Sequence, residues 1–250
     1  MLEESSVLAP APDISFVALS LNSTERAGFI RENLSVLPEL ELFPAVNGFS
    51  KEATARSLAS TPLKFHVYTF CNYARFATYG SLANFVTKYL ALRMQRRRRL
   101  PYMVMLEDDM ALRPGFRSFV EAAVRGGQLE RADLLVLGQW GEGYVTSLAS
   151  ARRVLAGLER QGVPLTIDIM LNDGHAGRAV RLTGAPWSHR VAPNAGDCLK
   201  TAHIGLHDLP RRCVHTCSGG PRCMRELDAR RRRYCHAGTA GAPGEAGSAR

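Results

Sequence analysis

The sequence predicts an α/β fold in which a mainly parallel sheet is flanked by helices. Short β-branched and apolar runs, which are typical of strands, alternate through about residue 160 with segments whose apolar residues recur at helical spacing. The chain has 250 residues, of which 46% are hydrophobic, so it is long enough to bury a sizeable core. Helices between strands serve as crossovers, and this arrangement favours parallel pairing of the strands.

The first half of the chain opens with a strand that leads into a helix. The segment "DISFVALSL", residues 13–21, is apolar and β-branched, and "STERAGFIRENL" follows with Ser23 or Thr24 as the N-cap of a helix. Less regular patterns predict two short strands, over residues 40–46 and 63–70. Between them, residues 51–60 are expected to be helical or irregular.

Apolar stripes then predict three longer helices, separated by two buried strands, "YMVMLE" (102–107) and "DLLVLG" (133–138). The first helix ends near the arginines at 96–99, and Gly126-Gly127 stop the second. In chain order, the stripe residues of the three helices are Leu82, Phe85, Val86, Tyr89 and Leu90; then Phe116, Phe119, Val120, Ala123 and Val124; then Ala151, Val154, Leu155 and Leu158.

The C-terminal part differs in composition, since it is rich in Gly, Pro, Arg and Cys from about residue 174. Five of the six cysteines fall between residues 198 and 235, which predicts a small disulfide-stapled appendage or a zinc site. Their spacing fits no common zinc pattern, so disulfides are favoured if the compartment is oxidising. The expected parts are an N-terminal extension, a main domain, a Cys/Arg-rich appendage and a disordered tail, over residues 1–12, 13–210, 211–236 and 237–250.

The compartment stays open at this stage. No apolar run approaches the roughly 18 residues of a membrane span, and the first residues lack the pattern of a signal peptide. As written, the chain is expected to be cytoplasmic or peripheral to a membrane. Two glycosylation sequons begin at Asn22 and Asn33, and such sites are modified only in a secretory compartment. If an N-terminal segment is missing, the protein is expected in the lumen of the endoplasmic reticulum or Golgi.

A net charge of +9 raises the question of an anionic partner. The arginine runs at 96–99 and 230–233 contain no interleaved aromatic residues that could stack on bases. The first run closes a helix, where cations suit the negative end of the helix dipole. An ordinary helix end is therefore the stronger interpretation of the first run. Attraction to a phosphorylated substrate or an anionic membrane surface ranks behind it, and nucleic-acid binding ranks last.

Three consecutive carboxylates, Glu107, Asp108 and Asp109, end the apolar run "YMVML". In open α/β sheets, ligands bind at the carboxyl ends of the strands, which is where these side chains are expected. Adjacent like charges repel unless a cation neutralises them, and oxygen ligands suit Mg²⁺ or Mn²⁺, which can bridge the oxygens of a diphosphate. The alternative is a solvated acidic turn that caps the helix beginning near Pro114.

Six segments stand out in chain order: "SLNSTERAGFIRENL", "FPAVNGF", "YGSLANFVTKYLAL", "MVMLEDDMALRPGF", "GEGYVTSLASARRVLAGL" and "TIDIMLND". Together they resemble glycosyltransferase family 25, which includes lipooligosaccharide and procollagen galactosyltransferases. The resemblance runs from about residue 13 to residue 173. Each segment alone is a weak signal, but their shared order is not expected by chance.

The resemblance implies a GT-A fold and an inverting transfer of galactose or a related hexose from a UDP-sugar, with Mn²⁺ or Mg²⁺ at the acidic motif. Asp109 is then the leading metal ligand, while Glu107 and Asp108 contact the metal, the ribose or the donor sugar. The residues that match the nucleotide side of the family are Leu19 to Asn22, Arg26, Gly80 and Ser81. The alternative for Arg26 is an ordinary surface arginine. The alternative for Gly80 and Ser81 is a plain first turn of a helix.

Inversion needs a base that takes the proton of the acceptor hydroxyl, and a carboxylate would serve. Asp168 matches the late acidic stretch of the family and is the first choice, with Asp173 and Glu142 behind it. The alternative role of Asp168 is a helix cap. His203 or His207 matches the late histidine that completes the metal site in GT-A enzymes, although a lone histidine is more often structural.

Two departures from the family bear on activity. Asn47 stands where the family usually carries Asp, and "YGSLANF" lacks the Cys and the Ser-His of the commoner "GCALSH" form. The identity of the donor sugar is therefore open. So is the acceptor: a glycan, a lipid-linked saccharide or hydroxylysine in a protein. Two other classes stay in view, an inactive glycosyltransferase-like binding protein and a basic nucleic-acid-binding protein.

Overall fold

The computed structural model describes residues 11–21, 23–66, 78–138, 142–161, 178–189 and 214–215. These residues fall into two compact units. Unit 1 is formed by described residues within Met1–Ala45, Thr87–Gly157 and Asp168–Ala195, and unit 2 by those within Val46–Val86, Leu158–Ile167 and Gly196–Arg250. Unit 1 contains the main sheet and all the carboxylates of the acidic motif.

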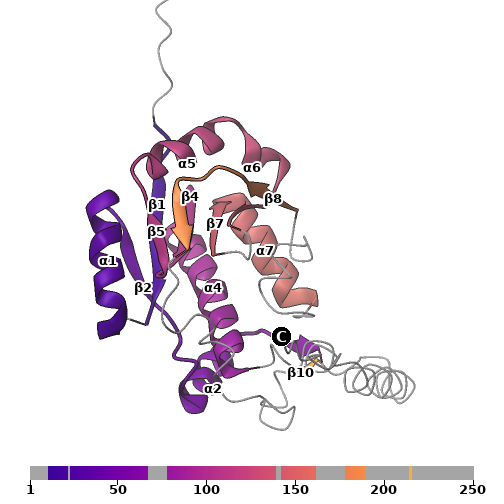
Figure 1. Cartoon of the computed structure of the whole chain (residues 1–250). Coiled ribbons are helices and arrows are strands. Elements are labelled where there is room, and N and C mark those ends of the chain that lie inside the picture. The colour runs from indigo at the N-terminus through magenta and orange to yellow at the C-terminus, as the bar shows by residue number, and fades with distance from the viewer. Residues whose placement is uncertain are drawn as a thin grey trace, which may run out of the picture. The chain divides into compact units, whose positions relative to one another are not determined.

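The main sheet has six strands in the order β2-β1-β4-β7-β6-β8. Strand β7 is antiparallel to both of its neighbours, whereas the other pairs of the sheet are parallel. All strands except β7 therefore point the same way, which confirms an α/β fold with a mostly parallel sheet (Figure 1). The strand bounds are β1 (Ile14–Ser20), β2 (Glu41–Pro44), β4 (Tyr102–Glu107), β6 (Leu134–Leu137), β7 (Gly143–Ser147) and β8 (Ala179–Leu182).

Two shorter sheets accompany the main one. In unit 1, β5 (Met110–Leu112) pairs antiparallel with β9 (Trp187–His189). In unit 2, β3 (Phe65–His66) pairs in parallel with β10 (Val214–His215). The described helices are α1 (Thr24–Val36), α2 (Lys51–Ala59), α4 (Tyr79–Arg98), α5 (Phe116–Arg125), α6 (Gln128–Arg131) and α7 (Leu148–Gln161).

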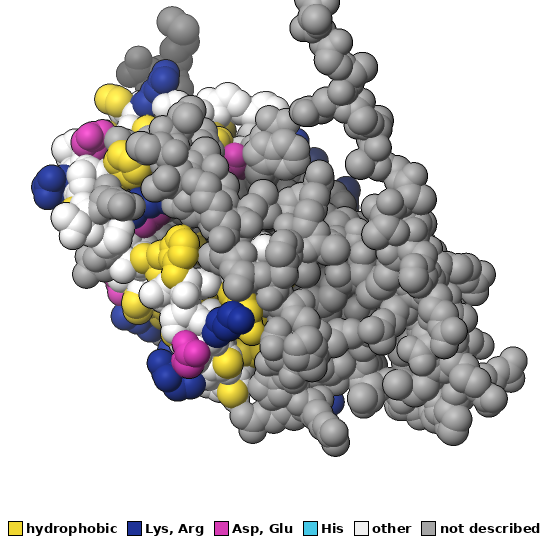
Figure 2. Space-filling model, turned by 60° about the horizontal axis from the view of Figure 1, so that its bottom comes forward, with side chains coloured by type: hydrophobic (Ala, Val, Ile, Leu, Met, Phe, Trp, Pro, Cys, Tyr) yellow, Lys and Arg dark blue, Asp and Glu magenta, His cyan; other side chains and the backbone are white. Residues whose placement is uncertain are grey.

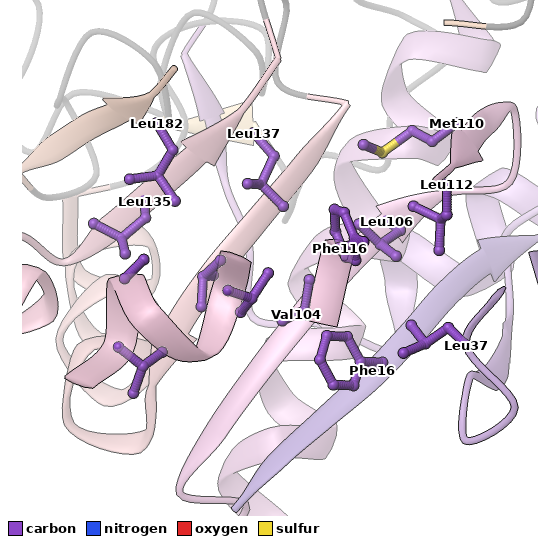
Figure 3. Packing of buried hydrophobic residues seen from close by; sticks show 14 of the residues in the cluster. Phe16, Leu37, Val104, Leu106, Met110, Leu112, Phe116, Leu135, Leu137 and Leu182 are labelled. Carbon is purple, nitrogen blue, oxygen red and sulfur yellow. The ribbon is translucent and has the colours of Figure 1, made fainter. Parts of the chain in front are cut away.

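One face of the main sheet packs against α5. Its buried cluster joins Phe16 of β1 and Val104 of β4 to Phe116 and Val120 of α5. The rings of Phe16 and Phe116 lie 6.4 Å apart between centroids and meet at 60°. Figure 3 shows Phe16, Val104 and Phe116 in one apolar layer, and Leu135, Leu137 and Leu182 extend this layer toward β8. Burial of this layer is the main force that holds the strands in their order.

The opposite face is covered by the part of α4 that belongs to unit 1. Side chains alternate between the faces of a strand, so Met103, which pairs with Thr146 of β7, points away from the cluster around Val104. The Gln95 side chain of α4 donates Nε2 to the Thr146 carbonyl at 3.2 Å and accepts the Thr146 hydroxyl at 2.7 Å. Both side chains are fully buried, so this reciprocal pair fixes α4 against the sheet.

The apolar stripes predicted α5 and α7 well and α4 less well. In α7 every predicted stripe residue is buried, and in α5 only Phe119 is half-buried. Helix α4 is buried around much more of its circumference than a single stripe, because Ala83, Thr87, Lys88 and Ala91 are buried while Leu90 is only half-buried. Its terminus was predicted correctly, since the helix ends at Arg98 and Arg99 follows with a φ of 57°.

The strands were predicted less completely. The sequence patterns missed β5, β7, β8 and β9, which are three to five residues long and carry too little alternation to be recognised. Of the strand expected over 63–70, β3 forms Phe65–His66, and residues 67–70 lie outside the described residues. Residues 51–60, expected to be helical or irregular, form α2.

Several predicted parts fall beyond what the structure describes. Residues 1–10, all six cysteines and residues 237–250 lie outside the described ranges, so the extension, the appendage and the tail stay predictions. Within the described ranges, no helix is both long and apolar enough to cross a bilayer.

Charges of both signs mix on the described surface. Figure 2 shows Lys and Arg side chains interspersed with acidic and hydrophobic ones over the coloured part of that face. In the first arginine run, Arg98 Nη1 lies 2.6 Å from Glu41 Oε1 of β2. At least one arginine of this run is therefore already matched by an acidic neighbour. Residues 230–233 lie outside the described part of the chain.

Asn33 fastens α1 to β5. Its side chain is 3% exposed, its Nδ2 donates to the Met110 carbonyl at 2.7 Å, and its Oδ1 accepts the Leu112 N–H at 3.1 Å. A sugar on Nδ2 would have no room, because Asn33 is buried between α1 and β5. The Asn33 sequon is therefore closed to modification in the folded protein, and Asn22 lies outside the described residues.

We expect Asn33→Ala to lower the free energy of unfolding by about 2–4 kcal/mol, because a buried carbonyl and a buried N–H each lose a partner. Urea unfolding would measure the loss. Asn47→Ala is a matched control, since Asn47 is exposed and its side chain accepts one turn hydrogen bond, from the Phe49 N–H at 2.9 Å. Equal losses in the two variants would show that the bridge between α1 and β5 contributes nothing special.

Candidate functional site

The carboxyl ends of β1 and β4 lie at a topological switch point of the main sheet. From β1 the chain passes to β2 on one side, whereas β4 lies on the other side and runs parallel to β1. Connections that leave in opposite directions open a crevice at the strand ends, where open α/β sheets bind ligands. Ser20 ends β1 and Glu107 ends β4. The acidic motif therefore lies at the edge where the sequence predicted it.

A tight turn carries Asp108 and Asp109 from β4 into β5. Strand β5 is held from two sides, by β9, where His189 lies opposite Met110, and by α1 through Asn33. Because both ends of the turn are anchored, the two carboxylates are presented in restricted directions.

Two basic side chains from other elements face the acidic motif. Lys88 Nζ of α4 lies 2.8 Å from Glu107 Oε1. Arg26 Nη1 of α1 lies 3.5 Å from Asp108 Oδ1 and 3.7 Å from Asp109 Oδ2, and it donates no hydrogen bond to the described residues. The guanidinium also stacks over a ring, with Cζ 5.7 Å from the Phe29 centroid.

These five charged side chains carry one net negative charge, since three carboxylates meet two cations. The sequence alone predicts that a metal ion neutralises the motif. In the folded chain Lys88 and Arg26 supply part of it, and both come from helices distant in sequence. The remaining negative charge, which a bound cation could neutralise, lies at Asp108 and Asp109. These two carboxylates share the single guanidinium of Arg26.

Burial raises the pKa of Asp108 above its ordinary value of 3.8, and the neighbouring charge of Glu107 adds to the shift. A hydrogen bond from the Ser20 side chain and the charge of Arg26 lower the pKa but do not cancel the effect of burial. The Asp108 side chain is 12% exposed. The ionised form of Asp108 therefore destabilises the fold. Shifted pKa values of this kind are common among charged residues of binding and catalytic sites.

We expect Asp108→Asn to stabilise the fold at neutral pH. Because the pKa is raised on folding, the folded protein binds this proton more tightly than the unfolded chain between pH 3.8 and the raised pKa. The stability of the wild type relative to the variant therefore falls as pH rises through this window and stays lower above it. Denaturant unfolding at several pH values would measure the difference, and an advantage that does not change with pH would contradict the role of burial.

Glu142 joins the same edge immediately before β7. Its carbonyl accepts the Glu107 N–H at 2.8 Å, and its side chain lies in a buried position that is 6% exposed. Gly138, which follows β6, has a φ of +92°, and a Cβ there would lie 2.2 Å from Glu142 Oε2 and 2.7 Å from Trp187 Cζ2. Glycine at this position leaves room for the Glu142 carboxylate.

Gly138→Ala is expected to destabilise the protein more than Gly184→Ala. Both glycines have positive φ, at +92° and +75°, so alanine costs about 1–2 kcal/mol at either site. Of these two positions, only Gly138 has atoms within 4 Å of the added Cβ. The clash of this Cβ with Glu142 adds about 1–3 kcal/mol. Thermal unfolding of the two variants would measure this difference. Equal losses would mean that the Glu142 carboxylate is free to move away.

In unit 2, the last four residues of "FPAVNGF" (46–49) meet "YGSLANF" at two glycines. A Cβ on Gly48 would lie 2.5 Å from Gly80 Cα, so the backbones touch. Asn47 Oδ1 accepts the N–H two residues further along, a turn that aspartate would make equally well. Ser81 donates its N–H to Thr78 Oγ1 at 3.2 Å, which caps the first turn of α4. The N–H of Ser81 is therefore already committed within this chain.

The remaining predicted site residues are placed as follows. Leu19 is 7% exposed within β1, so its side chain is part of the core. The others, Asn22, Asp168, Asp173, His203 and His207, lie outside the described residues.

The two aspartates of the turn have the chemistry of a divalent-cation site. Their carboxylate oxygens are the hard ligands that Mg²⁺ and Mn²⁺ prefer. A positive group, Arg26 Nη1, already stands close to both carboxylates. Within the described ranges, no three His, Cys, Asp or Glu side chains form a group that could hold a metal ion. A cation bound here would therefore need further ligands from water, a nucleotide or other parts of the chain.

The sequence patterns do not single out Lys88, and they place Ser20 only within the nucleotide-side segment Leu19 to Asn22, without its contact to Asp108. Lys88 stands between buried residues of α4, Val86 and Tyr89, and a lysine set among core positions is a signal that the helical pattern contained. Ser20 has no such signal, because its contact with Asp108 depends on the pairing of β1 with β4.

Chemically, this edge combines a pair of acidic side chains, a guanidinium that suits phosphate, and a buried lysine–glutamate pair. Such a set can bind a cation together with an anionic phosphate ligand. Comparison with known proteins adds no family: no protein-family model matches the chain, and no curated protein matches it.

Proposed function

We propose that this protein is a metal-dependent inverting glycosyltransferase of GT-A type. It moves a hexose, galactose in the first instance, from a UDP-sugar to a hydroxyl of a glycan, a lipid-linked saccharide or a protein. The observation that carries the proposal is the pair Asp108 and Asp109 at the switch point between β1 and β4, with Arg26 between their carboxylates. The order of the segments that resemble glycosyltransferase family 25 supports it.

Asp108 and Asp109 would hold Mn²⁺ or Mg²⁺, and the family resemblance alone makes His203 or His207 a candidate for a further ligand. When bound, the metal neutralises the charge that develops on the diphosphate leaving group. Ser20 hydrogen-bonds Asp108 and holds it in place. Arg26 suits the diphosphate, because a guanidinium binds phosphate oxygens in a bidentate manner and keeps its charge at all relevant pH values.

Inversion is a single displacement, in which the acceptor oxygen attacks as the diphosphate leaves. One carboxylate takes the proton of the acceptor hydroxyl, and Asp168 is the first candidate, ahead of Asp173 and Glu142. The exposed fraction of Glu142 is only 6%, so it has little room to meet an acceptor. This supports its place behind the two aspartates.

A screen of UDP-sugars for metal-dependent hydrolysis tests the function before any acceptor is known. We expect release of UDP from UDP-galactose or a related UDP-hexose with Mn²⁺, loss of this activity with a chelator, and little activity with GDP-sugars. Binding of UDP without turnover of any UDP-sugar, even with acceptors of the three classes, would indicate an inactive binding protein. No binding of UDP at all would contradict the proposal.

A further inference from the structure

Lys88 is a buried cation directed at the acidic motif. Its side chain is 1% exposed, and its Nζ lies 2.8 Å from Glu107 Oε1 and 5.2 Å from the centroid of the Tyr144 ring. The ring itself is fully buried in β7. The partner carboxylate is more open, since the Glu107 side chain is 27% exposed at the end of β4. One end of the pair thus lies in the core and the other at the candidate site.

Stability alone does not account for this arrangement. Removing an ammonium group from water is costly, and a well-packed apolar side chain in place of a buried ion pair is often as stable or more stable. The neighbours Val86 and Tyr89 are buried on the same helix, so methionine would continue the core there. The effect of the Lys88 charge on Glu107 is therefore the better explanation for a lysine at this position.

We propose that Lys88 is a positioning residue that holds Glu107 away from the cation and leaves cation binding to Asp108 and Asp109. This inference rests on the proposed function, because it assigns roles within the same metal site. With Lys88 matched to Glu107, the net negative charge of the motif lies on the two aspartates that share Arg26. Glu107 then presents its open side as an acceptor for ligand hydroxyl groups, and it is not a metal ligand.

The affinity for Mn²⁺ of the full chain, measured by electron paramagnetic resonance of free Mn²⁺, tests the assignment. Glu107→Gln removes a negative charge but no metal ligand, so it should raise the dissociation constant by no more than about fivefold, whereas Asp109→Asn removes a ligand as well and should raise it at least about tenfold. Lys88→Met frees the Glu107 charge beside the site, so Mn²⁺ should bind at least about fivefold more tightly. The double variant Lys88→Met/Glu107→Gln should return to the wild-type value.

A surface pair supplies the control. Arg153 lies 2.6 Å from Asp133 and its side chain is 59% exposed, so Arg153→Met removes a cation of unit 1 without touching the motif. It should leave the affinity for Mn²⁺ unchanged. A merely structural Lys88 would not give tighter binding that a second change at Glu107 reverses.

The outcomes separate the inference from the proposed function. Binding of Mn²⁺ by the wild type together with a tenfold loss in Glu107→Gln would overturn the inference and leave the function intact. No binding of Mn²⁺ by the wild type would overturn both. If Lys88→Met does not fold, Lys88→Gln takes its place: it should also bind Mn²⁺ more tightly, and Glu107→Gln should reverse the gain.

Discussion

Asp109→Asn is expected to lower kcat/KM for UDP-sugar turnover by about 10²- to 10³-fold, equivalent to about 3–4 kcal/mol of transition-state stabilisation. Asparagine keeps the size of the side chain and removes its charge. The wild-type set of three carboxylates and two cations carries one net negative charge, and the variant set carries none. Its attraction for a divalent cation should fall accordingly.

The effect should be specific to the switch-point edge. Asp13→Asn is a matched control, because Asp13 is exposed and precedes β1 at the end opposite the acidic turn. That variant should retain full activity and full dependence on Mn²⁺. Steady-state kinetics over a range of Mn²⁺ concentrations would measure both variants. An Asp109→Asn protein with wild-type kcat/KM would remove Asp109 from the metal site.

The second large effect is expected for Asp168→Asn, which should lower kcat by about 10²- to 10⁴-fold, the usual contribution of a general base. Asparagine has nearly the same size and can still cap a helix, so the fold and the affinity for the UDP-sugar should change little. The expectation comes from the resemblance to glycosyltransferase family 25, because Asp168 lies outside the described residues. Single-turnover kinetics with a saturating donor would measure the loss.

Asp173→Asn and Glu142→Gln provide the comparison for Asp168. A base is identified by a loss of kcat without a loss of donor affinity. If Asp168→Asn loses donor affinity in proportion to activity, or unfolds, Asp168 contacts the donor or supports the fold. The carboxylate with the largest isolated loss of kcat would then be the base.

Local patterns predicted the parts of the fold that depend on neighbouring residues. The burial of Val120 in α5 and of Val154 in α7 follows from the spacing of apolar residues within one helix. The place of Glu107 at the end of β4 follows from a general rule of α/β sheets. The short strand β7, by contrast, is antiparallel to its neighbours and is defined by pairing with β4 and β6, which no local pattern records.

The electrostatics of the site could not be predicted for the same reason. Arg26 follows β1 and Lys88 lies in α4, so neither is near Asp108 or Glu107 in sequence, and only the pairing of β1 with β4 and the packing of α4 bring them together. The sequence therefore presented three uncompensated carboxylates. In the folded chain, Lys88 and Arg26 neutralise two of the three charges. The remaining negative charge lies at the two aspartates, so the candidate cation site contains two carboxylates and not three.

Calorimetric titration of UDP into the wild-type protein, with Mn²⁺ and with a chelator, tests the central claim most directly. If Asp108 and Asp109 hold a metal ion that would offset the charge of the diphosphate, UDP should bind at least about tenfold more tightly with Mn²⁺, a difference of about 1.4 kcal/mol. Equal affinity for UDP with and without Mn²⁺ would contradict a metal-dependent nucleotide-sugar site at this edge.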